Sequence, residues 1–203
     1  MSQTKRLALV LLLNMAMISG LILIGLSSHS LGMLAAGGDY AADSLAILFG
    51  LLAIYFRDHT PYRKTATSIV ALINALLLLA VTSFVIAESF RRLFSHTPEI
   101  NGGSVFVISL VAALVMGIGV VILTIGKQKD DLHMRSVLLD TVADASSAAA
   151  VAATGAVILF HPKLSWLDSG VALIIGIVIA IQAIMLLRDV IKALRKAGQD
   201  NAK

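Results

Sequence analysis

The chain of 203 residues contains no cysteine, only three prolines and one tryptophan, and just 14% of its residues are charged. Without cysteine, the protein has neither disulfide bonds nor thiolate metal ligands. Soluble domains carry about 25% charged residues, whereas this chain is 58% hydrophobic with a mean hydropathy of +0.92. The scarcity of charge therefore excludes an ordinary soluble domain and indicates a membrane protein.

Six apolar runs follow one another with short loops between them. Each reaches or approaches the length of about 20 residues that a helix needs to cross about 30 Å of hydrocarbon. We therefore predict an all-α integral membrane protein with six transmembrane helices, forming a single domain over residues 1–203. The runs are Leu7–Ser28, Ser30–Phe56, Thr65–Ala87, Ser104–Gly126, Ser136–Phe160 and Ser169–Leu187.

Basic residues are distributed unevenly between the two sides of these runs. Thirteen lie at the termini and in the second-to-third and fourth-to-fifth loops, against three on the opposite side. The positive-inside rule then predicts that both termini are cytoplasmic, with residues 188–203 as a short basic cytoplasmic tail. Basic residues spread over loops fit topology better than nucleic-acid binding. The three exceptions are Arg91, Arg92 and Lys163.

Two Asp-x-x-x-Asp pairs stand inside the apolar runs. Asp39 and Asp43 form one pair, and Asp140 and Asp144 form the other. Four carboxylates within a bilayer cost on the order of 10 kcal/mol on insertion scales. Residues four apart lie on one face of a helix, so each pair presents two carboxylates to the same side.

The two pairs are expected at matching depths. At about 1.5 Å per residue, Asp39 lies about 13 Å and Asp43 about 19 Å below the outer surface, near the levels of Asp144 and Asp140 respectively. A divalent cation would neutralise carboxylates that otherwise repel one another. These four residues are therefore the predicted metal ligands.

Other polar residues are weaker candidates. Asn14 could lend an amide oxygen to the cluster, although a hydrogen bond across helices is the commoner role of a buried Asn. Glu88 is expected to pair with Arg91 and Arg92. The small residues of Ala143–Ala156 predict close packing of the fifth span.

Several motifs together resemble the cation diffusion facilitator (cation efflux) family of divalent-metal transporters. The resemblance rests on Asn14 within a leucine run, the segment Ser30–Ser44 with its two aspartates, Glu88-Ser89 at the end of span three, the segment Arg135–Ala145 and Trp166-Leu167-Asp168. It covers nearly all six runs.

The resemblance implies a homodimer in the cell (inner) membrane, with one site per protomer that exchanges a metal ion for protons. On this mapping Asp39, Asp43, Asp140 and Asp144 are ligands, and Asp168 orients a helix end. The divalent metal is the transported substrate, and no permanent cofactor is expected.

Two departures from the family pattern matter. Many zinc-selective members have His at one or both first positions of the pairs, whereas this chain has Asp39 and Asp140. An all-oxygen site favours manganese, iron or cobalt, with zinc and cadmium still able to bind. Most members also continue into a cytosolic ferredoxin-like domain, and we expect this chain to lack it.

Two alternatives use the same acids. A proton or sodium carrier would need no divalent metal. An intramembrane aspartyl protease would need one Asp on each of two facing helices, but neither a Tyr-Asp nor a Gly-x-Gly-Asp sequence is present.

Overall fold

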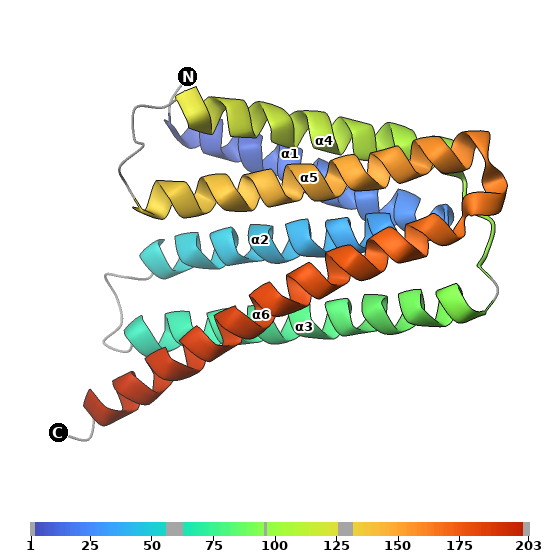
Figure 1. Ribbon diagram of the computed structural model, residues 1–203. Helices are drawn as coiled ribbons and strands as arrows, with labels where there is room; N and C mark the ends of the chain where they lie inside the picture. Colours follow the sequence, from blue (N-terminus) through green and yellow to red (C-terminus); the bar gives the residue numbers. More distant parts are fainter. Residues whose placement is uncertain (1–2, 56–62, 96, 126–131, 201–203) are drawn as a thin grey trace.

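The part of the chain that the computed structural model describes contains six long helices (Figure 1). The structure describes the backbone of residues 3–55, 63–95, 97–125 and 132–200, and the side chains of 15–42, 44–45, 71–95, 97–121, 139, 141–192 and 194–195. These ranges contain no strand. The helices are α1 (Gln3–Ser27), α2 (Leu31–Tyr55), α3 (Arg63–Phe94), α4 (Gly102–Ile125), α5 (Leu132–Phe160) and α6 (Trp166–Asp200), with a short 3₁₀ helix η2 (Pro162–Leu164) before α6.

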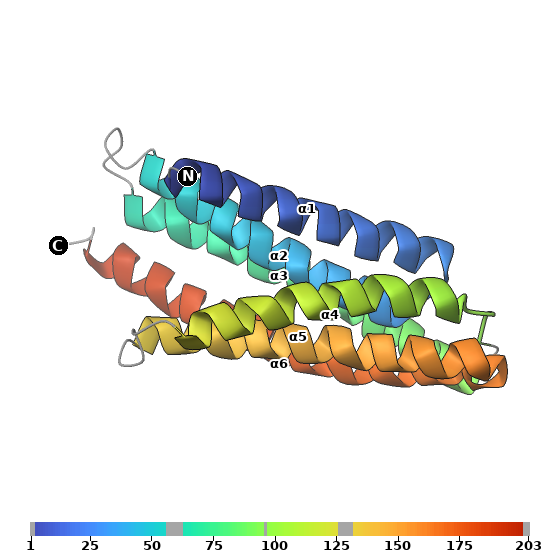
Figure 2. The same ribbon diagram turned by 90° about the horizontal axis from the view of Figure 1, so that it is seen from above.

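The helices lie in two layers of three. Figure 2 shows α1, α2 and α3 in one layer and α4, α5 and α6 in the other, and Figure 1 shows both chain ends at one end of the bundle. We call that end the terminal end, and the opposite end, where α1 turns into α2, the connector end. Because α2 faces α5 and α6 across the layers, it lies at the centre of the bundle.

Within the described residues, each predicted run lies on a helix of its own apart from Ser28 and Ser30 at the α1–α2 turn, which confirms the all-helical expectation. Helices α3 and α6 extend furthest beyond their runs. Helix α3 continues past Ala87 through Glu88 and the two arginines to Phe94, and α6 continues through the predicted basic tail to Asp200. These extensions carry charged residues. A helix can continue beyond the hydrocarbon with its backbone hydrogen bonds intact, while the charged ends of its side chains lie in water.

Four helices are long and apolar enough to cross a membrane among the residues described, and they belong to α3, α4, α5 and α6. A shorter apolar stretch, Met15–Ser27, lies on α1. Large apolar side chains such as Phe84, Leu114 and Ile174 are exposed on the outside of the bundle. Helices that are apolar on their outer faces fit a lipid surround. The count of six spans and the side on which the termini lie remain predictions.

The turn from α1 into α2 is a Schellman motif with an unusual residue. The Ser30 N–H donates to the Gly25 carbonyl at 3.0 Å, and the His29 N–H donates to the Leu26 carbonyl at 3.3 Å. This pattern needs a left-handed residue, usually glycine, at the position that His29 occupies with φ 57°. The motif turns the chain within three residues, so α2 starts directly beside the end of α1.

Helices α4 and α5 approach each other closely at two glycines, which confirms the close packing predicted for the fifth span. A Cβ atom on Gly155 would lie 2.5 Å from the Phe106 backbone nitrogen, and one on Gly102 would lie 2.5 Å from the Leu159 nitrogen. Backbones this close gain dispersion contacts that lipid cannot replace. Small residues therefore hold α4 against α5.

Gly155→Ala tests this contact. The added methyl group meets backbone atoms, which cannot rotate away, so we expect a loss of roughly 1–3 kcal/mol in stability and a transition several degrees lower in detergent thermal unfolding. Gly117→Ala on α4 is the matched control, because no atom lies within 4 Å of its added Cβ. Equal transition temperatures for the two variants would contradict the close α4–α5 packing.

Candidate functional site

The Asp168 carboxylate, in the first turn of α6, binds the first turn of α2. Its oxygens accept hydrogen bonds from the Ser30 hydroxyl at 2.6 Å and from the Leu31 N–H at 2.7 Å, with the Gly32 N–H at 3.4 Å. Ser30 also caps α2 itself, since its hydroxyl oxygen accepts from the Met33 N–H at 3.2 Å. Asp168 is only 1% exposed. One carboxylate thus satisfies backbone donors that the start of a helix leaves unpaired.

Arg92 attaches the end of α3 to the same junction. Its guanidinium donates to the His29 carbonyl at 2.6 Å and to the Glu88 carboxylate at 3.0 Å. Glu88 also pairs with Arg91 at 2.7 Å, which confirms the predicted ion pairing. The connector end therefore joins α1, α2, α3 and α6 through polar contacts between side chains and backbone.

Helix α2 runs antiparallel to α5 in a defined register. The Tyr40 hydroxyl donates to the Asp144 backbone carbonyl at 3.1 Å. Nearer the connector end, a Cβ atom on Gly32 would lie 3.1 Å from the Val151 side chain. Because Gly32 meets Val151 directly, and Asp39 and Asp144 are each seven residues from that contact toward the terminal end, the backbones of the two aspartates lie at similar levels.

The same register relates the two remaining aspartates. From the Tyr40–Asp144 contact toward the terminal end, Asp43 is three residues further along α2 and Asp140 is four residues back along α5. Asp43 and Asp140 are each eleven residues from the Gly32–Val151 contact, so their backbones also lie at similar levels. Asp39 and Asp43 on α2 therefore each have an aspartate of α5 at a similar level.

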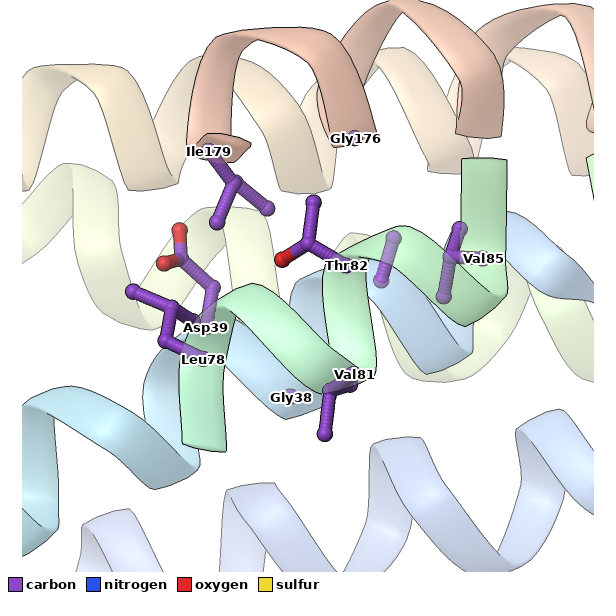
Figure 3. A pocket seen from close by; sticks show the side chains of 9 residues that line it. Gly38, Asp39, Leu78, Val81, Thr82, Val85, Gly176 and Ile179 are labelled. Atoms are coloured by element: carbon purple, nitrogen blue, oxygen red, sulfur yellow. The ribbon is translucent and has the colours of Figure 1, made fainter. Parts of the chain in front are cut away.

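The Asp39 side chain is half-buried and lines a narrow pocket between α2, α3 and α6 (Figure 3). Its carboxylate points toward Ile179 of α6, and the Thr82 hydroxyl of α3 is turned toward the same space. The pocket is narrow and only partly enclosed, so Asp39 keeps part of its side chain exposed.

Only part of the predicted cluster falls within the described side chains. Asp39 and Asp144 are both half-buried and both engaged in interactions, whereas the side chains of Asp43, Asp140 and Asn14 lie outside the described set. Among the side chains described, no three His, Asp or Glu lie together in a way that could hold a metal ion. The helix register thus brings the four backbone positions to matching levels, and the ligand set stays a prediction.

Sequence reasoning did not single out Tyr40 or Thr82. Tyr40 is 4% exposed and connects α2 to α5 at the level of the aspartates. Thr82 is also buried and borders the Asp39 pocket. A phenol directly after an intramembrane Asp, and a Thr shortly after a run of leucines, were the available signals, but a hydroxyl in a helix often bonds its own backbone instead.

Carboxylates on two facing helices of a multi-helix membrane protein are typical of ion and substrate pathways. Residues 7–195 match the sequence profile of the cation efflux transmembrane domain. The chain therefore belongs to the cation efflux family, as its motifs predicted. The members of this family are transporters and not enzymes, so the aspartyl protease alternative is set aside, and the chain is a multi-pass membrane protein.

Curated relatives carry names of metal transporters. The chain is 26% identical to a cadmium, cobalt and zinc/H(+)-K(+) antiporter of Bacillus velezensis, over 95% of this chain and 64% of that protein. It is 24% identical to the zinc transporter ZitB of Pectobacterium atrosepticum, over 94% and 61% respectively, and 25% identical to the metal cation efflux system protein CzcD of Cupriavidus metallidurans, over 87% and 57%. The chain thus spans about 57–64% of the length of these relatives.

Replacing Asp168 tests the junction at the connector end. Asp168→Ala leaves the Ser30 hydroxyl and the Leu31 N–H without their acceptor, and each buried unsatisfied group costs roughly 1–3 kcal/mol. We expect a clearly lowered unfolding temperature in detergent. Asp189→Ala on the same helix is the control, because Asp189 is exposed and its 3.7 Å pair with Lys192 contributes at most about 1 kcal/mol. Equal stability of both variants would show that Asp168 does not hold α2.

Proposed function

We propose that this chain carries divalent metal cations out of the cell in exchange for protons, through a site formed by Asp39, Asp43, Asp140 and Asp144. The observation that supports it best is the α2–α5 register set by the Tyr40–Asp144 hydrogen bond at 3.1 Å. This register puts two acidic pairs at matching levels on facing helices. Family membership and the names of the relatives point to the same class of cargo.

Coupling to protons follows from the charge of the site. Four carboxylates at close range in a medium of low dielectric constant cannot all be ionised without a compensating cation. In the metal-free state the group therefore holds protons as a coupled set. An arriving divalent cation replaces them, and protons return when the metal leaves on the other side. One relative is named for zinc and H(+)-K(+) antiport, which agrees with protons as counter-ions.

Alternating access requires movement around the aspartates. The pocket beside Asp39 is narrow and only partly enclosed in the present arrangement, and Asp39 is half-buried in it. Helix α2 carries the first acidic pair at the centre of the bundle, and α3 and α6 pack against one another along much of their length (Figure 1). Rocking of the α3–α6 pair relative to α2 would open the pocket without breaking backbone hydrogen bonds.

The membrane arrangement that goes with this function has six spans, cytoplasmic termini and a homodimer. The excess of basic residues on the terminal side supports this orientation. With both termini inside, the terminal end of the bundle faces the cytoplasm, where the metal is collected. The all-oxygen ligand set suits manganese, iron or cobalt and also accepts zinc or cadmium.

Purified protein in liposomes tests the proposal directly. Zinc, cadmium, cobalt or manganese added on one side should drive proton movement, followed with a pH-sensitive dye inside the vesicles. Asp43→Asn and Asp144→Asn should reduce this flux to the level of empty vesicles, because each removes a ligand and a proton site. Asp189→Asn, an exposed carboxylate outside the site, should keep it. Proton flux that needs only sodium, or no metal, would favour the carrier alternative instead.

Asp140→His tests how the ligand type sets selectivity. Imidazole binds zinc well and manganese less well, and the substitution removes one negative charge that attracts hard cations. We expect the ratio of zinc to manganese transport to rise on the order of tenfold, equivalent to about 1.4 kcal/mol. Competition between the two metals in wild-type and variant liposomes measures this ratio. An unchanged ratio would mean that this position does not determine metal choice.

A further inference from the structure

Asn74 on α3 has a buried side-chain oxygen without a described partner. The residue is 6% exposed, and its Oδ1 atom accepts no hydrogen bond from any residue that the structure describes. Three buried serine hydroxyls share this condition, those of Ser89, Ser109 and Ser169. A serine hydroxyl can rotate toward a carbonyl of the preceding turn, but an amide oxygen can only accept. Asn74 therefore needs a donor or a cation that comes from elsewhere.

The face of α3 that carries Asn74 is the face that lines the Asp39 pocket. Leu78 and Thr82 follow Asn74 at intervals of four residues and so lie on the same face of α3. Both line the pocket together with Asp39 (Figure 3). Neighbours of Asn74 off this face, such as Leu76 and Leu77, are exposed on the outside of the bundle. Asn74 thus belongs to the inner face of α3, next to α2.

Asn74 also lies at the level of the second aspartate of α2. Leu78 and Asp39 border the same pocket, and α2 and α3 are antiparallel (Figure 2). Asn74 precedes Leu78 by one turn, Asp43 follows Asp39 by one turn, and both steps lead toward the terminal end. The backbones of Asn74 and Asp43 are therefore at similar levels on neighbouring helices.

We propose that Asn74 is a specificity-determining residue of the transport site, whose amide oxygen receives the hydrated divalent cation on the terminal side of the aspartates. This inference rests on the proposed function. A neutral oxygen suits the task, because it accepts hydrogen bonds from the water shell of the ion or binds the ion itself without adding a fifth negative charge. A site that must also release its ion gains from such a weak first contact.

Asn74→Leu tests the inference, because leucine has a similar volume and no oxygen. Titration calorimetry of zinc and manganese binding in detergent should show dissociation constants raised about five- to tenfold. In liposomes, KM for the metal should rise by the same factor while the maximal flux changes less than twofold. Ser109→Ala on α4 is the matched control, since it also removes a buried oxygen without a described partner, and it should leave both constants unchanged.

Asn74→Asp keeps an oxygen at the same place and separates binding from packing. The added carboxyl group should tighten metal binding severalfold at pH 8 relative to pH 6, with a steeper pH dependence than in the wild type. A residue that only fills space would show the wild-type pH dependence after this nearly isosteric change. The variant therefore decides the matter even if Asn74→Leu does not fold.

The outcomes separate this inference from the proposed function. If wild-type protein moves divalent metals and Asn74→Leu keeps wild-type dissociation constants and KM, Asn74 is a packing residue and the inference alone is wrong. A lowered unfolding temperature with unchanged metal binding leads to the same conclusion. If wild-type protein binds and moves no divalent metal, the proposed function fails, and the role of Asn74 fails with it.

Discussion

The carboxylate of Asp168 sets the position of the central helix, and the depth of the acidic residues depends on it. Because it accepts from the Ser30 hydroxyl and the Leu31 N–H, the start of α2 cannot slide along α6 without leaving buried donors unpaired. Asp39 and Asp43 follow about two and three turns further along the same helix. A hydrogen-bonded helix is stiff, so a contact at its first turn determines the level of residues deep within the bundle. The Arg92 contact with the His29 carbonyl secures the preceding turn in the same way.

The polar chemistry of the bundle is divided between its ends and its middle. At the connector end, Glu88 pairs with Arg91 and Arg92, and Asp168 accepts hydrogen bonds from the start of α2. Such groups hold helices in place. In the middle, Asp39 borders a narrow pocket, and the Asn74 oxygen has no described partner. A buried oxygen like that of Asn74 gains from a donor or a cation, which is the basis of the role proposed for it.

The packing between helices permits relative movement of some helices and restricts that of others. The Gly102 and Gly155 contacts bring the backbones of α4 and α5 together, so these two helices form a firm pair. The α3–α6 pair has larger side chains in its interface, such as Val85 and Ile86 against Gly176. Helix α2 lies between the two pairs and carries the first acidic pair. A relative shift of the pairs would therefore change access to Asp39 while most contacts within each pair persist.

The sequence alone determined the six helices, their approximate limits, the family and the four acidic positions, because each depends on local patterns: apolar length, i to i+4 spacing and short motifs. It also indicated the Glu88 ion pairing, since the partners lie within one turn. Tertiary structure alone decided which helices meet and at which level. The Tyr40 contact with the Asp144 carbonyl and the bonds between Asp168 and α2 join residues more than a hundred positions apart. No periodicity within a single segment encodes such pairings. The lack of a described partner for the Asn74 side-chain oxygen likewise depends on tertiary structure, because it is known only once the neighbouring helices are placed.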